Sequence, residues 1–366
     1  MKSKELFSHS PIWELQRKYY QEKGIEAWSS GEVPHYITSN IKIASAYADI
    51  ILGVLKDVCQ KANSNTRVNI VELGAGSGRF SYHVLKHLEQ KLLDRQVGVA
   101  TYRYIMTDFS KSNINFWKEH PRFSTYVSEG KLDFSLFDAE KDDAINLQHS
   151  GITIDMKSEE GLIVVIANYF FDSIRQDLFY CSDGKARSVE MSLDIKNNEI
   201  RDIEPEYSLS EEVVFPYYNE IELDGLLQKY AASLNDSYVL FPDMGIRCLN
   251  RLKELSNEGI IVLSSDKGKH RFDSIDFTDA PDIATHGSLS LSTNYNALKL
   301  HCENSGGVTI FPLHQHEFLA FGALFYVKEP KKYKETLRVS KQQIQSFGPD
   351  DFFSIKKFVE RNIEGL

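Results

Sequence analysis

The chain of 366 residues contains only four cysteines, and they lie far apart. No two of them form a Cys-x-x-Cys pair, so the sequence indicates neither a cysteine-bound zinc site nor a disulfide framework. Scattered thiols are typical of a reducing compartment, and we therefore expect a cytoplasmic protein. No apolar run approaches the length that a membrane span needs, and the first residues lack the apolar core of a secretory signal.

Positive charge is also scarce. Lysine and arginine number 42 against 52 aspartate and glutamate residues, which gives a formal net charge of −10. Proteins that bind nucleic acids neutralise phosphates with basic residues, and no basic stripe is visible here. The charge balance therefore argues against nucleic acid as a general partner, and it leaves room only for a local basic groove.

The most informative segment is a glycine-rich turn that follows an apolar run. Residues 68–73 have the character of a buried strand, residues 74–78 read Gly-Ala-Gly-Ser-Gly, and residues 80–93 have the character of a helix. Glycines allow a tight turn and leave room for a ligand against the main chain. The spacing differs from the G-x-G-x-x-G dinucleotide fingerprint, and the phosphate-binding G-x-x-x-x-G-K-[ST] loop is absent from the sequence.

The charge at the end of this strand narrows the choice of ligand. Glu72 would repel a phosphate, but it suits a cationic group such as the amino acid half of S-adenosylmethionine. The segment therefore favours a methyl-donor site. A glycine turn with a purely structural role is the alternative interpretation.

Apolar strands and amphipathic helices alternate around this motif. We expect strands at residues 68–73, 102–107, 132–137, 162–167, 260–263 and 308–311, and helices at 41–62, 80–93, 111–119, 220–232, 244–255, 294–303 and 317–326. This alternation predicts an α/β fold with a Rossmann-like, mainly parallel sheet and helices on both faces. Residues 178–193 predict a hairpin, and the acidic residues 194–216 predict a surface excursion.

The pattern divides the chain into five regions. Residues 1–62 form an irregular aromatic segment and a helix, and residues 63–180 form the donor-binding core. Residues 181–235 supply the hairpin and the acidic insertion, residues 236–329 complete the core, and residues 330–366 form a charged helical extension. We expect the first and third regions to build a cap on the acceptor side of the site.

Polar side chains stand at the ends of four consecutive expected strands, namely Glu72, Asp108, Asp138 and Asn168. Ligands of open parallel sheets bind at these ends. We expect Asp108 to accept from the ribose hydroxyls and Asp138 from the adenine amine. Phe109 and Phe137 are the candidates for stacking on the adenine, and we expect Asn168 near the reacting sulfur. One polar residue at a strand end is commonly only a turn former, but four in order are harder to explain in that way.

At these motifs the chain resembles class I S-adenosylmethionine-dependent methyltransferases. Among them it resembles the MidA family, which includes the mitochondrial complex I assembly arginine methyltransferase. The resemblance covers about residues 30–325 and rests on residues 34–39, 72–78, 167–174, 282–287 and 315–322. It implies S-adenosylmethionine as the donor and a protein side chain of the arginine type as the acceptor.

The motifs and the resemblance together give the expected site. The donor-binding residues are Thr38, Glu72, Gly74, Ala75, Gly76, Gly78, Asp108, Phe109, Asp138, Ala139 and Asn168. The expected catalytic residues are Asn168, Asp172 and His286, with His286 as an acceptor-side base or hydrogen-bond donor. A histidine bonded only to backbone is an equally open interpretation of His286. The remaining histidines do not have the ligand spacing of an open metal site, so we expect no metal.

Two departures from the family pattern bear on the acceptor. Tyr169 stands where the family has a glutamate that could pair with a guanidinium, and Ser288 stands where an aspartate is usual. The acceptor could therefore be a small molecule with a nitrogen or oxygen nucleophile, or the chain could be a non-catalytic assembly factor that keeps the fold. A dinucleotide-dependent oxidoreductase is a further alternative, which the glycine spacing and Glu72 disfavour. The sequence does not indicate an oligomeric state.

Overall fold

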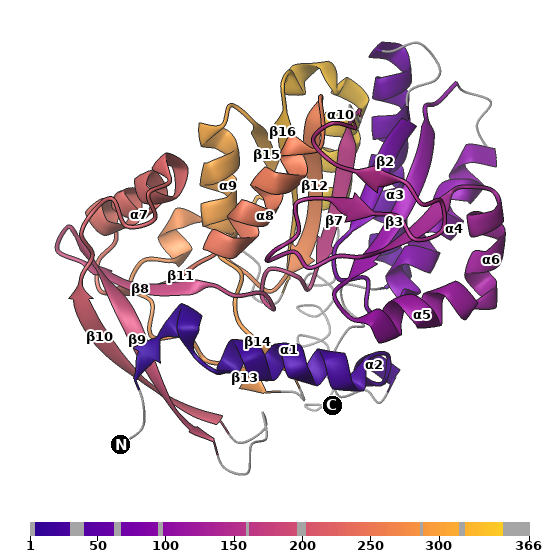
Figure 1. Cartoon of the computed structure of the whole chain (residues 1–366). Helices are drawn as coiled ribbons and strands as arrows, with labels where there is room; N and C mark the ends of the chain where they lie inside the picture. Colours follow the sequence, from indigo (N-terminus) through magenta and orange to yellow (C-terminus); the bar gives the residue numbers. More distant parts are fainter. Residues whose placement is uncertain are drawn as a thin grey trace, which may run out of the picture.

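A seven-stranded sheet forms the centre of the computed structural model (Figure 1), which describes residues 4–29, 40–61, 67–93, 98–158, 161–195, 203–285, 288–314 and 319–346. Its strand order is β15–β16–β12–β7–β2–β3–β4. The strands are β2 (Arg67–Glu72), β3 (Thr101–Asp108), β4 (Leu132–Leu136), β7 (Ile163–Asn168), β12 (Gly259–Asp266), β15 (Val308–Ile310) and β16 (Ala320–Val327). The five strands from β4 to β12 run parallel, and β16 is antiparallel to both of its neighbours.

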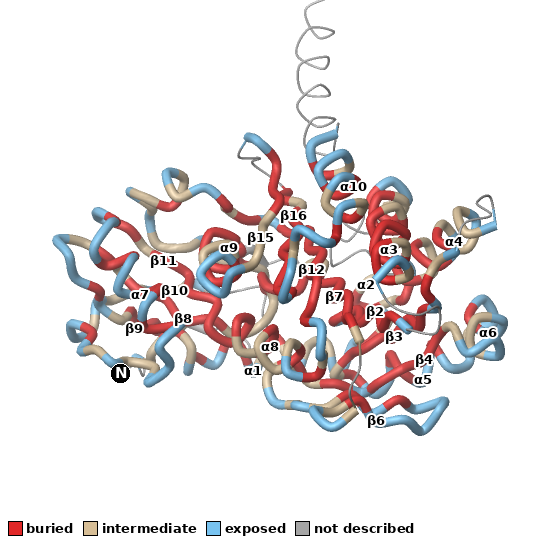
Figure 2. Tube along the Cα trace, turned by 90° about the horizontal axis from the view of Figure 1, so that it is seen from above, coloured by how far each residue is buried: buried red, intermediate tan, exposed pale blue. Residues whose placement is uncertain are grey.

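Alternate residues of the central strands enter two different cores, because successive side chains of a strand point to opposite faces. In β7, Ile163 and Val165 share a core with α8 (Asp243–Glu254) and α9 (Tyr295–Asn304). Val164 and Ile166 share the other core with α3 (Ile41–Lys61), α4 (Arg79–Leu93), α5 (Lys111–Glu119), α6 (Pro121–Ser128) and α10 (Lys334–Ile344). The tube in Figure 2 shows this buried centre with exposed helix faces around it, and the α/β fold class predicted from the sequence is confirmed.

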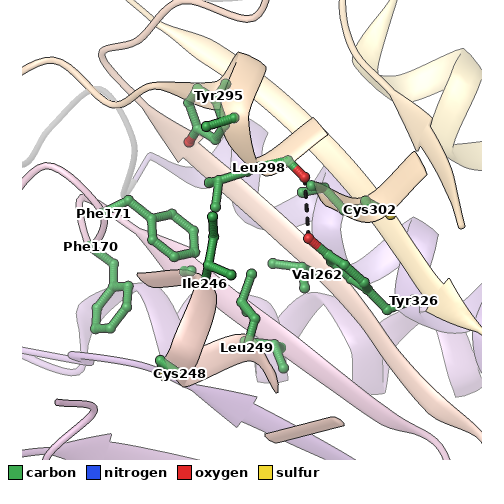
Figure 3. Close-up of a cluster of buried hydrophobic side chains, with 14 of the residues drawn as sticks. Phe170, Phe171, Ile246, Cys248, Leu249, Val262, Tyr295, Leu298, Cys302 and Tyr326 are labelled. Carbon is green, nitrogen blue, oxygen red and sulfur yellow. Dashed lines mark hydrogen bonds between the residues drawn. The ribbon is translucent and has the colours of Figure 1, made fainter. Parts of the chain in front are cut away.

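The first core is closed by side chains from widely separated elements (Figure 3). Val262 of β12 and Tyr326 of β16 meet Ile246 and Leu249 of α8 and Leu298 of α9. The Tyr326 hydroxyl donates to the Leu298 carbonyl at 3.2 Å, so the polar tip of this buried ring is satisfied. Phe170 and Phe171, which follow β7, pack into the same core and fix the chain where it leaves the sheet.

A smaller antiparallel sheet lies beside the large one (Figure 1). It contains β1 (Glu5–Leu6), β8 (Asp177–Ser182), β9 (Lys185–Ile195), β10 (Ile203–Glu212) and β11 (Ser237–Phe241), and α7 (Ile221–Ser233) packs against it. The predicted hairpin is confirmed as β8 and β9. Asp183 and Gly184 at its tip both have positive φ, 53° and 75°, as a two-residue hairpin turn requires.

The N-terminal segment is helical where the sequence suggested irregular structure. After the short turn at Phe7–His9, α1 (Ile12–Lys23) and α2 (Glu26–Ser29) run across one end of the large sheet (Figure 1). Only Ile12, Trp13 and Gln16 of α1 are buried, so the helix has little of the apolar stripe by which such helices are recognised. The remaining short elements are the pairs β5 (Ile145–Asn146) with β6 (Thr153–Ile154) and β13 (Ala284–Thr285) with β14 (Leu289–Ser290), and the turns Phe272–Ser274 and Pro330–Lys332.

Most of the predicted strands and helices are confirmed within a few residues, including the Asn40 cap of α3, whose side chain accepts from Ile43 N at 2.9 Å. The helix expected at 317–326 is wrong, because residues 320–327 form β16. A short run that is apolar on every side fits a strand buried on both faces as well as a buried helix. Here pairing with neighbouring strands decides, since residues 320–327 pair along their whole length with β12 and in part with β15.

Two further expectations need correction in the small sheet. Residues 203–212 of the expected surface excursion form β10, which pairs with β9 from Ile203 to Glu212. Its glutamates and proline hid the alternation of the strand. The strand β11 was not predicted at all, although residues 237–241 read Ser-Tyr-Val-Leu-Phe. In the described part of the chain, no helix is both long and apolar enough to cross a membrane.

One buried carboxylate ties α10 to the core. Asp57 of α3 accepts from the backbone N–H groups of Glu335 and Thr336 at 3.2 and 2.8 Å and from the Thr336 hydroxyl at 2.7 Å. It therefore acts as a cap from another helix for the first turn of α10.

We expect Asp57→Ala to lower the free energy of unfolding by about 1–3 kcal/mol, because two N–H groups and a hydroxyl lose their acceptor. Asp57→Asn keeps an acceptor oxygen and should lose less than half as much. Urea denaturation at pH 7 measures both variants. Equal stability of Asp57→Ala and the wild type would contradict this role.

Candidate functional site

The ends of the parallel strands and the N-terminal helices enclose one cavity of about 180 Å³. Its walls come from the ends of β2, β3, β4 and β7, from α1 and α2, and from the residues around β14 (Figure 1). Ligands of doubly wound sheets bind in this position. Nine of the predicted donor-site residues line the cavity, namely Glu72, Gly74, Ala75, Gly76, Asp108, Phe109, Asp138, Ala139 and Asn168.

The glycine loop is held between two tryptophans. Gly76 has φ +55°, its N–H donates to Asp108 Oδ2 at 3.2 Å, and its carbonyl accepts from Trp117 Nε1 at 2.9 Å. A Cβ at this position would lie 2.8 Å from the Trp28 ring, so both the backbone conformation and the packing require glycine. The loop therefore presents bare main chain to the cavity, and Gly78 lies behind it against Met106 and Phe123.

Glu72 ends β2 with its carboxyl group buried beside the loop. It accepts from the hydroxyls of Ser81 and Tyr104, the latter at 2.7 Å. Burial raises the pKa of Glu72 to about 7, against the opposing effect of these two hydrogen bonds. A cation placed beside this carboxyl would favour its charged form.

Asp108 ends β3 and holds three donors of its own chain. They are the N–H groups of Gly76 and Ser110, at 3.2 and 2.8 Å, and Asn113 Nδ2 at 3.0 Å. Burial raises the pKa of Asp108, and these donors oppose the shift. The backbone of Phe109 also favours the charged form, so donors of the chain itself already surround this carboxylate.

Asp138 is bound by a residue that the sequence analysis did not consider. Arg17 of α1 donates to both of its oxygens, with Nη1–Oδ1 and Nη2–Oδ2 distances of 3.3 and 2.6 Å. The same guanidinium lies 4.7 Å from the centre of the Phe109 ring. Arg17 thus contacts both the predicted acceptor and the predicted stacking partner of adenine.

Asn168 ends β7 and lines the cavity, but its amide oxygen points to neighbouring elements. The oxygen accepts from the Tyr47 hydroxyl at 2.6 Å and from Ser265 N at 3.1 Å. The next residue, Tyr169, has φ +47° and also lines the cavity. The chain therefore turns sharply after β7 at Tyr169, the position at which the MidA family has a glutamate.

Asp172 completes this turn and lines the cavity while being 3% exposed. Its side chain accepts from the Ser173 hydroxyl at 2.7 Å, and its N–H donates at 3.2 Å to Asp266 at the end of β12. Burial raises the pKa of Asp172 to about 6 and holds that of Asp266 well above its ordinary value, with the charge of Asp172 adding to the effect on Asp266. Tyr20 of α1 hydrogen-bonds Ser288 at the same end of the cavity.

The remaining predicted donor-binding and catalytic residues either fall outside the described part of the chain or do not line the cavity. Thr38 and His286 are outside the described residues, so their roles stay predictions. The aromatic residues of the two regions expected to form the cap have different positions. Trp28 lines the cavity, whereas Trp13 is buried against Phe7, and Tyr217 and Tyr218 pack on Phe179. No group of three potential metal ligands is present among the residues that the structure describes.

Sequence reasoning missed the contribution of α1, which supplies Gln16, Arg17 and Tyr20 to the cavity wall. It also missed Asp266. The signal for Asp266 was its place after a short apolar run, at the end of a fifth parallel strand. For α1 the local sequence holds no comparable signal, because its contacts join residues more than 100 positions apart.

The chain matches no protein-family model and no curated protein. Among solved structures it is similar to an uncharacterized ACR protein of the COG1565 superfamily from Burkholderia thailandensis, with a TM-score of 0.52, 11% identity and 90% of each chain covered. A second COG1565 superfamily member from that organism, bound to S-adenosyl-homocysteine, gives a TM-score of 0.44 at 12% identity and covers 82% of this chain and 79% of its own.

Human N-acetylserotonin methyltransferase in complex with S-adenosylmethionine gives a TM-score of 0.32 at 8% identity, with 87% of this chain and 67% of that chain covered. At identities this low, a likeness concerns the fold. Together with the observed strand order, the likeness to the first of these structures supports a Rossmann-like fold for this chain.

Removal of the Arg17 guanidinium should destabilise the protein at neutral pH. Burial by itself raises the pKa of Asp138, but the Arg17 pair holds this pKa below its ordinary value. The pair therefore adds stability above about pH 4, and this contribution is lost as the pH falls through the lowered pKa.

We expect Arg17→Met to lower the free energy of unfolding by about 1–2 kcal/mol at pH 7, and the difference from the wild type to narrow toward pH 3. Lys18→Met, which removes only the exposed pair with Glu22, is the matched control and should change stability by less than about 0.5 kcal/mol. Urea denaturation at several pH values measures both. If the difference in the free energy of unfolding between Arg17→Met and the wild type did not change with pH, the stabilisation could not be assigned to the pair with Asp138.

Proposed function

We propose that this chain is an S-adenosylmethionine-dependent methyltransferase whose donor binds in the cavity at the strand ends. The observation that carries the proposal is the convergence, in one cavity, of the glycine loop with the polar ends of four parallel strands. The charges fit this donor, because its ammonium and sulfonium groups are cationic and the carboxyl groups that line the cavity are anionic when ionised. A pyrophosphate would meet Glu72 and Asp108 instead of donors.

Each part of the donor has a candidate partner. Glu72 and the glycine loop would hold the methionine portion, and Asp108 at the end of β3 would face the ribose hydroxyls. Phe109 and Asp138 would hold the adenine, but the adenine amine can use Asp138 only if Arg17 gives up part of its pair with that carboxylate. Donor binding would therefore shift Arg17 and, with it, α1.

The reaction we propose is dominated by positioning. The bound donor supplies an electrophilic methyl group, and the protein aligns the acceptor with it and keeps water out. Tyr20 and Trp28, stacked with ring centres 5.6 Å apart, would cover the cavity from the side of α1 and α2. The acceptor would enter toward Tyr169, Asp172 and Ser288.

The acceptor we propose is a protein side chain, as the resemblance to the MidA family implies. Tyr169 in place of a glutamate removes a charge that would pair with a guanidinium, so a small molecule with a nitrogen or oxygen nucleophile is the alternative acceptor. A non-catalytic assembly factor that retains only the donor site is the alternative function. A cytoplasmic location is part of the same proposal and rests on the scattered cysteines.

Calorimetric titration with S-adenosylmethionine and S-adenosylhomocysteine tests the donor site. We expect wild-type binding in the micromolar range and at least tenfold weaker binding by Asp108→Asn, because the carboxylate that faces the ribose is lost. The matched control is Asp133→Asn, since Asp133 is also buried and accepts three backbone N–H bonds but does not line the cavity. No binding to folded wild-type protein would refute the proposal.

The pH dependence of donor binding tests the role of Glu72. With a pKa of about 7, Glu72 is about half ionised at pH 7 and about one-tenth ionised at pH 6, so affinity should fall roughly fivefold over this interval. Glu72→Gln should bind S-adenosylhomocysteine, which lacks the sulfonium charge, more weakly and without this dependence. Glu89→Gln, in a pair with Lys131 away from the cavity, should keep the wild-type dependence. An equal pH dependence of donor affinity in wild type and Glu72→Gln would show that a group other than Glu72 is responsible.

A further inference from the structure

Two buried aspartates meet at the acceptor end of the cavity. Asp172 lines the cavity, and Asp266 lies directly behind it with no exposed surface. The Asp172 N–H donates to Asp266 Oδ2 at 3.2 Å, and the two buried carboxyl groups are close enough to influence one another's ionisation. Two carboxyl groups buried next to one another cannot easily both be ionised, so the arrangement favours a state in which one of them keeps its proton.

The surroundings of the pair supply hydrogen bonds but little positive charge. Asp266 accepts from the Thr293 hydroxyl at 3.0 Å and from Lys267 N at 2.8 Å, and Asp172 accepts from the Ser173 hydroxyl. The titratable groups that face the pair are Tyr20 of α1, Tyr47 of α3, Tyr295 of α9 and Lys267. The tyrosines are neutral near pH 7, Lys267 is exposed to solvent, and the described residues form no ion pair with either aspartate.

The pair is asymmetric. Asp266 is fully enclosed, and its carboxyl group is remote from solvent, so ionisation costs it more than it costs Asp172 at the cavity wall. Two neighbouring carboxyl groups cannot easily both be ionised in a site that excludes water. The proton therefore remains with the inner residue, and the negative charge faces the cavity on Asp172.

We infer that Asp172 and Asp266 share one proton, and that Asp266 is a positioning residue that keeps Asp172 as the base for the methyl acceptor. This inference rests on the proposed function of the cavity. It makes the acceptor a group whose nucleophilic atom carries a proton, an O–H or an N–H, rather than a thioether or another atom without one.

The proton balance of the step is simple. The lone pair of the acceptor atom forms a bond to the methyl carbon, while the carbon–sulfur bond breaks and its electron pair stays on sulfur. The proton of the acceptor atom passes to the Asp172 carboxylate, which becomes a neutral acid and later releases the proton to water. No other reactant is needed.

A carboxyl ¹³C NMR titration of the full chain labelled at aspartate tests the pair without an acceptor. In wild type, we expect two coupled titrations, the first near pH 6 and the second well above it. In Asp266→Asn the asparagine amide can donate to Asp172, so the remaining titration should move down by at least about one unit. Asp172→Asn should likewise lower the titration of Asp266, and Asp133→Asn should leave the pair unchanged.

Titrations with each of the two donor-site ligands bound test whether the aspartate pair lies near the reacting sulfur. S-adenosylmethionine carries a positive sulfonium and S-adenosylhomocysteine a neutral thioether, so only the former should lower the Asp172 titration further. Wild-type Asp172 and Asp266 signals that both titrate near pH 4, or an Asp172 titration that Asp266→Asn leaves in place, would overturn the shared proton. Equal titrations with the two ligands bound would overturn the role in methyl transfer.

The outcomes also separate this inference from the proposed function. If calorimetry shows that neither ligand binds, the proposed function fails, and the titration of the free protein still decides whether the proton is shared. If both ligands bind and the free protein shows no coupled titration, the donor site stands and the inference about Asp266 fails.

Discussion

At the edge of the sheet where the cavity lies, the structure is arranged around four carboxyl groups that are shielded from water. Glu72, Asp108, Asp172 and Asp266 are each no more than 5% exposed. A buried carboxyl group must be hydrogen-bonded or protonated, because an isolated charge in a dry site is costly. The neighbouring elements meet this demand with Ser81 and Tyr104 for Glu72, the glycine loop and Asn113 for Asp108, and Ser173 and Thr293 for the aspartate pair.

This constraint explains why the cavity needs the N-terminal helix α1 as well as the strand ends. The parallel strands deliver the carboxyl groups, but they leave one side of the cavity open. The helix α1 closes that side: Gln16 donates to the Ser173 carbonyl and accepts from Leu289 N, and Arg17 neutralises Asp138. The N-terminal helix is therefore part of the site, and not only a cap on the domain.

The sequence predicted what is encoded locally. A strand, a glycine turn and a helix follow one another at residues 67–93, and each has its own signature there, so the loop and Glu72 were placed correctly. The run at 320–327 had no such signature, since burial on both faces removes the alternation that separates strand from helix. Contacts between distant residues leave even less trace. Arg17 meets Asp138 across 121 positions and Asp172 meets Asp266 across 94, and neither partner reveals the other in the sequence.

The raised pKa values have a common consequence for the proposed reaction. Glu72 at one end of the cavity and the aspartate pair at the other are partly protonated near neutral pH because they are buried. A donor with an ammonium at one end and a sulfonium near the other would stabilise their charged forms, so its binding would release protons from the protein. The ionised Asp172 carboxylate would then be most abundant when the donor is in place. Binding of the cationic donor would thus increase the ionised fraction of the carboxyl groups around it, including the Asp172 carboxylate that is to accept the proton.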